Sequence, residues 1–172
     1  MRVVDSTNSI QSKVVIVKHQ PGAIGMRLLG LGPNLMPTRS LWKLQRLLDQ
    51  HSFWAASRSK YKLKHKLNFS VAVVSAWNGT HLIGFGRAST DGVFRAVLWD
   101  IVVSTEWQGQ GIGRRLVENL LSTSTLSDVE KIYLMTTKSG GFYKKLGFSH
   151  SVDQRLLVLE KKRLMFTSQS KC

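Results

Sequence analysis

Residues 107–116 read Trp-Gln-Gly-Gln-Gly-Ile-Gly-Arg-Arg-Leu, between an apolar run at 96–103 and a helical pattern at 111–121. This order predicts a strand, a glycine turn and a helix that begins in the turn. The first backbone N–H groups of a helix have no partner inside it, and the helix dipole favours negative charge at that end. The stretch therefore predicts an anion site, and a phosphate-bearing ligand fits it.

The composition predicts one compact domain that spans residues 1–172. With 172 residues and 42% hydrophobic content, the chain suffices for one core and not comfortably for two. No apolar stretch approaches the roughly 20 residues that cross a bilayer, and the N-terminus lacks the apolar block of a secretory signal, so we expect no membrane partner. The only cysteine, Cys172, is the last residue. An intramolecular disulfide is therefore excluded, and we expect no metal.

The chain is strongly basic, with 25 Lys and Arg against 10 Asp and Glu and a net charge of +15. The densest basic run lies at 58–66, and a smaller one lies at 161–163. Such a charge attracts polyanions and speeds their encounter. The plainest interpretation is two solvated faces, and a surface that steers a cofactor or an acidic partner is the alternative. Nucleic acid is disfavoured because no recognisable nucleic-acid motif accompanies the two runs.

The first half of the chain predicts one strand and two helices. A β-branched run predicts a strand at 13–18, and frequent Gly and Pro predict a loop at 20–38. Leucines at helical spacing predict a helix of about three turns that begins near Ser40. Residues 58–67 are ambiguous, because their lysines alternate as in a strand while Leu63 and Leu67 lie four apart; we favour a helix.

The second half predicts mainly strands. Runs at 69–77 and 81–88 surround an Asn-Gly turn, and a second turn leads into a strand at 94–103. Further patterns predict a strand at 131–136, a short helix at 140–146 and a final strand at 155–160. We expect an α/β (α+β) fold with a mixed, mostly antiparallel central sheet flanked by helices.

Two common phosphate-binding motifs do not fit the glycine turn. A dinucleotide fingerprint needs its third glycine one residue later than Gly113. A nucleotide P-loop needs Lys and a hydroxyl residue after its last glycine, but Arg114 and Arg115 follow here. The antiparallel hairpins before the turn also contradict the parallel unit that both motifs require.

Two motifs instead resemble the GCN5-related N-acetyltransferase (GNAT) family. Gln108, Gly111 and Gly113 resemble its Gln-x-x-Gly-x-Gly acyl-CoA loop, and Gly-Phe-Tyr-Lys-Lys-Leu-Gly-Phe at 141–148 resembles its C-terminal "FYxxLGF" signature. The resemblance covers residues 34–160, which leaves an N-terminal strand and loop at 1–33 and a basic tail at 161–172. Residues 85–94 and 98–103 narrow it to the branch of plant chloroplast acetyltransferases, including the serotonin N-acetyltransferase type, and their cyanobacterial and algal-plastid relatives.

The resemblance implies an acetyl-CoA-dependent N-acetyltransferase. Its acceptor would be an arylalkylamine such as serotonin or tryptamine, or a lysine or N-terminal amine of a protein. The alternative is a non-catalytic protein on the same fold that senses acyl-CoA or docks on an acidic partner or nucleic acid. A bacterial or cyanobacterial cytoplasm or the plastid stroma is the expected location, and a homodimer is compatible with the family. The positive charge disfavours histone-like, lysine-rich acceptors.

The resemblance also assigns the cofactor contacts. The pantetheine arm would pair with the backbone of the strand, and an N–H of Val102 or Val103 would polarise the thioester oxygen. A buried strand is the structural alternative for this segment, and the residues fit that interpretation equally well. The backbone N–H groups of the loop would bind the pyrophosphate, and the Arg114 guanidinium would add charge-assisted bonds. The expected cofactor-binding residues are Ile101, Val102, Val103, Gln108, Gly109, Gln110, Gly111, Ile112, Gly113 and Arg114.

Two residues are expected to be catalytic. Tyr143 occupies the tyrosine position of the family motif, where a phenol can protonate a departing thiolate; core packing is the alternative. Asp100 stands in an apolar strand, and a carboxylate is costly to bury unless it is paired or used. It would orient the acceptor ammonium or take its proton, and a buried structural partner is the alternative. Glu106 is a weaker base candidate in a polar turn.

Trp99 and Thr136 join Asp100 as expected substrate-binding residues. Trp99 would line the acceptor pocket, although a tryptophan on a core strand is more often packed. Thr136 stands seven residues before the motif tyrosine, where the family often has asparagine and some plant relatives have an acid. A site with two carboxylates is therefore in doubt, and Asp100 would have the larger role.

Overall fold

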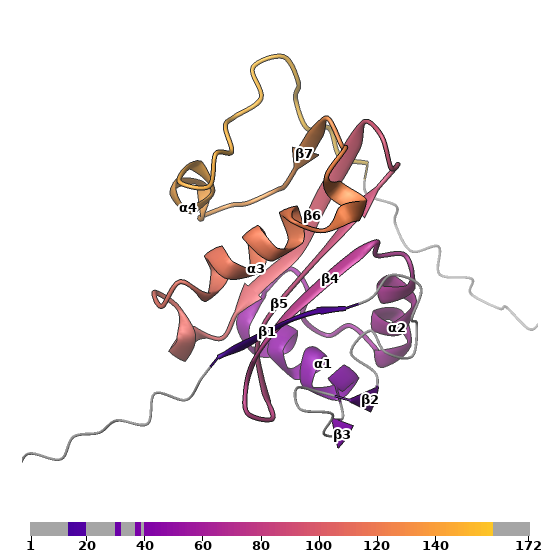
Figure 1. Ribbon diagram of the computed structural model, residues 1–172, viewed down its shortest axis with the longest axis vertical. Coiled ribbons are helices and arrows are strands. Elements are labelled where there is room, and N and C mark those ends of the chain that lie inside the picture. The colour runs from indigo at the N-terminus through magenta and orange to yellow at the C-terminus, as the bar shows by residue number, and fades with distance from the viewer. Residues whose placement is uncertain (1–13, 20–29, 32–36, 39, 160–172) are drawn as a thin grey trace, which may run out of the picture. The chain divides into compact units, whose positions relative to one another are not determined.

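The computed structural model describes residues 14–19, 30–31, 37–38 and 40–159 (Figure 1). By its internal contacts the chain divides into two compact units, which meet between Thr136 and Thr137. No helix in the described ranges combines the length and the hydropathy that a membrane crossing needs.

The first unit contains a five-stranded sheet. Its strands are β1 (Val15–His19), β4 (Ala72–Asn78), β5 (His81–Thr90), β6 (Arg95–Val103) and β7 (Lys131–Tyr133), in the order β1-β4-β5-β6-β7. All neighbouring pairs are antiparallel except β6 and β7. Two short strands, β2 (Gly30–Leu31) and β3 (Pro37–Thr38), form a separate ribbon. The mixed, mostly antiparallel sheet predicted from the sequence is confirmed.

Helices cover both faces of this sheet (Figure 1). They are α1 (Ser40–His51), α2 (Lys60–Asn68) and α3 (Ile112–Leu121), with short 3-10 turns η2 (Thr105–Trp107) and η3 (Ser124–Leu126). Leucines of α1 and α2 share one buried cluster with Phe85 of β5. The neighbouring Gly84 instead faces Leu116 of α3. Because successive strand residues point to opposite faces, α3 packs on the face opposite α1 and α2.

Two glycines of β5 let α3 approach the sheet closely. A Cβ atom at Gly84 would lie 3.0 Å from Leu116 Cδ1. One at Gly86 would lie 2.6 Å from Ile101 Cδ1 and 3.0 Å from Leu120 Cδ1. These separations are shorter than ordinary carbon contacts, so the space above both glycines already holds side chains of the helix and of β6.

A β-bulge interrupts the pairing of β5 with β6. Phe85 pairs with Val102 and Arg87 pairs with Trp99, so two residues of β6 stand opposite Gly86 alone. One of them is Asp100, whose φ of +53° lies in the left-handed region that Asp and Asn tolerate better than most residues. The bulge therefore turns the Asp100 side chain out of the regular alternation of the strand.

Most elements expected before residue 137 are present, with shifted ends. The ambiguous segment 58–67 is the helix α2, and the first strand is β1, although Lys13 lies outside the described residues. Most of the expected loop at 20–38 also lies outside them. The strand expected at 131–136 ends at Tyr133, where pairing with β6 stops at Val97.

The second unit contains α4 (Gly140–Lys144) and a chain without further regular structure. Gly147 closes the helix with a φ of +89°, and the Phe148 N–H donates to the Tyr143 carbonyl at 3.1 Å. The strand expected at 155–160 is wrong over residues 155–159, which form no strand and expose their apolar side chains. A β-rich run becomes a strand only where another strand pairs with it, and the described residues provide no such partner.

Candidate functional site

The loop between β6 and α3 places unpaired backbone donors at a helix start. Gly109 and Gly111 have φ of +77° and +78°, a conformation that favours glycine. The first helical bond runs from the Arg115 N–H to the Gly111 carbonyl at 3.1 Å. The N–H groups of residues 112–114 therefore have no acceptor inside the helix and can receive an anion from outside.

Side chains of the loop hold its shape. Gln108 Nε2 donates to the Val103 carbonyl at 3.0 Å, and Gln110 Nε2 donates to the Glu106 carbonyl at 3.1 Å. Both amides therefore tie the loop to the chain that leaves β6. Residues 108–111 are exposed, so an exposed glycine loop rich in N–H donors is present, and a pyrophosphate group fits it.

Arg114 already has a partner on the surface. Its Nε donates to Glu118 Oε1 at 2.7 Å, and the Arg114 side chain is 63% exposed. Such surface pairs contribute little and exchange readily. The expected contact between the Arg114 guanidinium and a phosphate would have to compete with Glu118, whereas the N–H groups of residues 112–114 have no acceptor inside the helix.

The C-terminal half of β6 has a free backbone edge. Pairing with β7 ends at Val97, and no described strand continues it along residues 98–103. Val102 is buried among the leucines of α1 and α2, while Ile101 and Val103 are half-buried. An exposed strand edge can pair with an extended ligand that has its own amides, so this segment fits a pantetheine arm.

Asp100 is surrounded by three cations. Its Oδ2 accepts from Arg87 Nε at 2.7 Å and from Lys66 Nζ at 2.9 Å, and its Oδ1 accepts from Arg58 Nη1 at 3.3 Å. The Asp100 side chain is 4% exposed. One carboxylate against three cations leaves this cluster, named the Asp100 cluster here, with two positive charges in excess.

The electrostatics of the Asp100 cluster keep the carboxylate ionised. Burial raises the pKa of Asp100, but the charges of Lys66 and Arg87 outweigh it, and the pKa lies below its usual value. Burial, together with the neighbouring Arg charges, lowers the pKa of Lys66 and of Arg87 although Asp100 raises both. A carboxylate with a lowered pKa and three donors is a weak base, so the geometry favours the structural alternative for Asp100.

The other candidates on or near β6 also have polar partners. Trp99 Nε1 donates to Ser89 Oγ at 2.8 Å, and the Arg87 guanidinium lies 5.5 Å from the Trp99 ring centroid. Glu106 accepts from the Ser104 hydroxyl, and this bond lowers the pKa of Glu106. Thr136 is exposed at the end of the first unit. Only Trp99 of these lies beside the Asp100 cluster, through Arg87.

Tyr143 belongs to the second unit, where it is 9% exposed. Its ring meets those of Phe142 and Phe148 edge-on, at centroid distances of 4.9 Å and 5.8 Å. Burial raises the pKa of the Tyr143 phenol, so the group stays protonated at neutral pH. This state suits a general acid, and the aromatic neighbours equally suit core packing.

Sequence reasoning missed Arg58, Lys66 and Arg87 as partners of Asp100. One signal was present: no acidic residue lies between Asp49 and Asp91, although six Lys and Arg do. Half-buried cations in that segment need an acid from elsewhere, and Asp100 is the acid that stands inside an apolar strand. The bulge that aims Asp100 at these cations gave no signal in the sequence.

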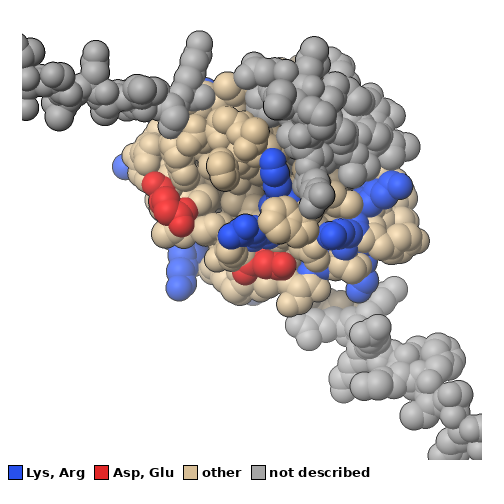
Figure 2. All heavy atoms as spheres, turned by 90° about the horizontal axis from the view of Figure 1, so that it is seen from below, with Lys and Arg blue, Asp and Glu red and all other residues tan. Residues whose placement is uncertain are grey.

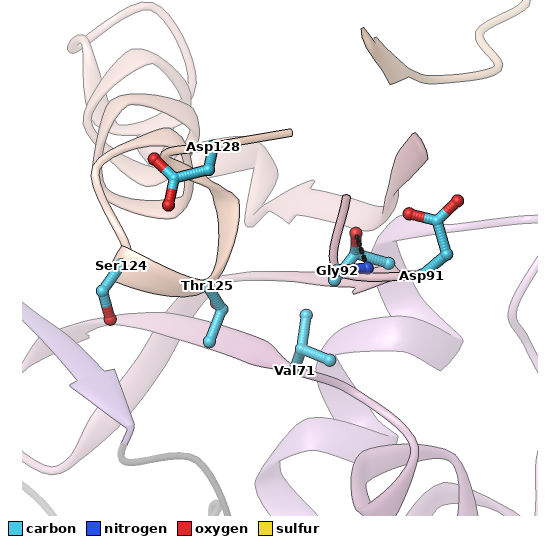
Figure 3. A pocket seen from close by; sticks show the side chains of 7 residues that line it. Val71, Asp91, Gly92, Ser124, Thr125 and Asp128 are labelled. Carbon is cyan, nitrogen blue, oxygen red and sulfur yellow. Dashed lines mark hydrogen bonds between the residues drawn. The ribbon is translucent and has the colours of Figure 1, made fainter. Parts of the chain in front are cut away.

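A hollow of about 330 Å³ lies where the turn between β5 and β6 faces η3 (Figure 3). Asp91 Oδ1 accepts from the backbone N–H groups of residues 93–95, and the Gly92 N–H donates to Thr90 Oγ1 at 2.9 Å. The bonds from the Arg95, Val93 and Phe94 N–H groups lower the pKa of Asp91, and its carboxylate thereby closes the turn. The polar groups that Thr90, Asp91 and Gly92 contribute to this hollow are therefore explained by the turn.

Comparison with known proteins gives a consistent family. Residues 40–148 match the acetyltransferase (GNAT) family. The chain is 30% identical over 149 residues to "Histone acetyltransferase TAP1" of Glycine max, which is 80% of this chain and 63% of that protein. It is 42% identical over 72 residues to "Serotonin N-acetyltransferase 2, chloroplastic" of Oryza sativa subsp. japonica, 41% of this chain and 36% of that protein.

A solved structure supports the fold. A putative GNAT acetyltransferase from Xanthomonas campestris superposes with a TM-score of 0.67 at 17% identity, over 91% of this chain and 98% of that one. The chain thus spans nearly all of that domain, but under two thirds of the length of the Glycine max relative. The likeness in structure confirms the GNAT fold expected from the two motifs.

Proposed function

Because the chain belongs to the GNAT acetyltransferase family, we propose that it is an N-acetyltransferase that moves the acetyl group of acetyl-CoA to a primary amine. Acetyl-CoA is the cofactor of this family. The observation that carries the proposal is the loop at 108–114, where two left-handed glycines and a helix start present backbone N–H groups at the end of β6.

The reaction is the aminolysis of a thioester. The bound cofactor would supply the acetyl group: the amine nitrogen forms a C–N bond and releases one proton to solvent, the C–S bond breaks, and the thiolate takes a proton. In this chain the loop N–H groups would hold the pyrophosphate, and the edge of β6 at Ile101–Val103 would hold the pantetheine arm. By the family resemblance, an N–H of Val102 or Val103 would stabilise the oxyanion, and Tyr143 would give its phenolic proton to the thiolate and regain one from solvent.

The acceptor is an amine of low positive charge. The names of the two relatives differ on this point, since one names histones and the other names serotonin. The net charge of +15 and the two excess positive charges of the Asp100 cluster both repel a polycationic acceptor. An arylalkylamine, or one lysine or N-terminal amine on a protein, meets less repulsion.

The location and the assembly follow from resemblance alone. One relative is named as chloroplastic, so we place the protein in the plastid stroma, with a bacterial cytoplasm as the other setting. The single acetyltransferase domain over 1–172 and the homodimer remain predictions. Gel filtration with light scattering would report the number of subunits directly.

The test is the release of free CoA thiol from acetyl-CoA with serotonin, tryptamine and peptides that have a single amine. We expect thiol release that depends on the amine, with mass spectrometry identifying an acetylated product. Lysine-rich peptides should be poor acceptors at low salt. Tight binding of CoA without turnover on any amine would contradict the enzymatic function and favour a non-catalytic acyl-CoA sensor.

A further inference from the structure

The exposed side of α2 combines aromatic rings with lysines in a regular order. Leu63 and Leu67 are buried in the core and fix which side of the helix faces the sheet. At about 100° per residue, positions 61, 65 and 69 fall on the opposite side, which points to solvent. Lys60 and Lys64 then flank this row on one side, and positions 62 and 66 flank it on the other.

The three rings form a continuous row. The centroids of Tyr61 and His65 lie 6.2 Å apart, and those of His65 and Phe69 lie 4.9 Å apart. Tyr61 is 77% exposed and Phe69 is 69% exposed. Exposure of this much aromatic surface in one row is unfavourable in water, and such rows mark binding surfaces more often than isolated apolar residues do.

A hollow of about 290 Å³ opens beside this row. Two aromatic residues and two lysines line it: Tyr61, His65, Lys62 and Lys66. A flat ring system can stack on the aromatic walls while an attached anion meets the ammonium groups. The hollow is therefore suited to a planar group that has a phosphate close by.

The lysines of α2 outnumber the acidic residues near them in the sequence. No acidic residue lies between Asp49 and Asp91, and Lys66 pairs with Asp100. Within the described part of the chain, Lys60, Lys62 and Lys64 have no ion-pair partner. Figure 2 shows one face of the molecule on which Lys and Arg side chains predominate over Asp and Glu.

We propose that this surface of α2, the aromatic-lysine row, binds a single strand of nucleic acid. Unpaired bases stack on Tyr61, His65 and Phe69, and the phosphates lie along the lysines at either side. The sequence alone disfavoured this partner because no nucleic-acid motif was present. The helix geometry adds what the sequence lacked, since it gathers the rings and the lysines on one exposed face.

Two other polyanions explain less of this surface. An acidic peptide would use the lysines and leave the exposed rings without a role. An anionic bilayer would take rings at its interface, but the imidazole of His65 lies in the middle of the row. Because α2 and α3 cover opposite faces of the sheet, the aromatic-lysine row is also separate from the loop at 108–114 and independent of the acetyltransferase proposal.

The experiment measures the fluorescence anisotropy of a labelled oligouridylate of about 12 nucleotides, a length within the range of known single-strand sites. The full chain should bind it, with affinity that falls as salt rises, and a duplex of equal length should bind more weakly. The double variant Tyr61→Ala, Phe69→Ala should bind at least about 10-fold more weakly, because stacking on each ring is lost. Both residues are exposed, and circular dichroism checks that the variant folds.

Matched variants separate stacking from charge. Phe94→Ala removes an exposed ring at another turn, and it should leave binding unchanged. Lys62→Gln with Lys64→Gln should flatten the salt dependence, by about 0.7 in the logarithmic slope for each phosphate contact. Lys131→Gln, an exposed site on β7, should have a smaller effect.

Several outcomes would overturn the proposal. They are equal binding by the Tyr61→Ala, Phe69→Ala variant, equal or tighter binding of an oligoglutamate, and recruitment to anionic vesicles in preference to the oligonucleotide. Displacement of the oligonucleotide by CoA at concentrations that saturate the cofactor site would also overturn it, because the probe would then occupy the cofactor loop. Retained binding in saturating CoA supports it.

Discussion

The loop at 108–114 and the residue Asp100 lie close in the sequence, yet they act in different ways. The loop offers its backbone: its glycines adopt left-handed conformations, and its side chains bond to Val103 at the end of β6 and to Glu106 in η2. Asp100 offers its side chain, which pairs with three cations from other parts of the chain. The comparison indicates that the loop is suited to bind a ligand through its backbone, whereas the Asp100 side chain is suited to hold elements of the fold together.

The largest effect is expected for Asp100→Asn. Asparagine tolerates the left-handed backbone, so the change removes the charge and leaves three half-buried cations without an anion. Removal of one partner from a buried ion cluster costs about 3 kcal/mol of unfolding free energy. Urea denaturation at neutral pH measures it.

Turnover of the same variant distinguishes a structural role of Asp100 from a catalytic one. If Asp100 were the general base, Asp100→Asn would abolish turnover at full stability, and the structural role would be wrong. The matched change Arg87→Gln should cost less stability, because Asp100 then keeps Lys66 and Arg58.

Tyr143→Phe tests a side chain to which the resemblance assigns chemistry. Loss of a general acid typically lowers kcat about 100-fold, and the KM for acetyl-CoA should stay within a few-fold because the loop is intact. Since burial raises the pKa of Tyr143, ionisation of the phenol should not reduce turnover below about pH 10. Unchanged kcat in the variant would exclude Tyr143 as the general acid and favour core packing as its role.

Gly111→Ala tests the backbone side of the comparison. A Cβ at a φ of +78° costs about 1 to 2 kcal/mol of strain and distorts the start of α3. We expect the KM for acetyl-CoA to rise about 10-fold, the equivalent of a loss of 1.4 kcal/mol in binding. Gly92→Ala is the control, because Gly92 has a φ of +89° in the turn before β6. It should lower the unfolding free energy and leave the KM for acetyl-CoA unchanged. Equal changes in KM for both variants would remove the loop from cofactor binding.

Acid should weaken the Asp100 cluster. The folded pKa of Asp100 lies below its ordinary value of about 3.9, so its contribution to stability is complete above that pH and is lost as the pH falls through the folded pKa. The difference in unfolding free energy between the wild type and Asp100→Asn should therefore shrink below about pH 4. A difference that stays constant down to pH 2 would contradict the ionic role.

The smallest effect is expected at the surface pair of Arg114 and Glu118. Glu118→Gln should change the unfolding free energy by less than about 0.5 kcal/mol, because the pair is exposed and lies one helical turn apart. It also frees the Arg114 guanidinium, so the KM for acetyl-CoA should stay equal or fall slightly. A several-fold rise in that KM would show that Glu118 itself positions the loop.

The sequence predicted what depends on local patterns. Glycine spacing located the loop, and the leucines at 63 and 67 identified α2 despite its alternating lysines. Alternation and two turn signals located the three consecutive antiparallel strands. Each of these signals is contained in a few neighbouring residues, where backbone conformation and burial are decided locally.

The rest depends on residues that meet only in the folded chain. The partners of Asp100 lie 13, 34 and 42 positions away, and the bulge that aims its carboxylate arises from a shift in register between β5 and β6. The run at 155–159 has strand propensity without a described partner strand. Strand propensity in a short run does not indicate which distant strand will pair with it. A single charged residue likewise does not indicate which distant groups will form its ion pairs.

The most direct test is a two-dimensional N–H spectrum recorded as CoA is added to the 19.3 kDa chain. Binding at the backbone loop predicts the largest shifts at Gly109, Gly111 and the first N–H groups of α3, with further shifts along residues 101–103. The Arg87 Nε–H, held by Asp100, should move little. Large shifts of the Arg87 signal without shifts of the loop signals would contradict cofactor binding at the loop. The Asp100 cluster would then be the ligand site, and the loop would be only a turn.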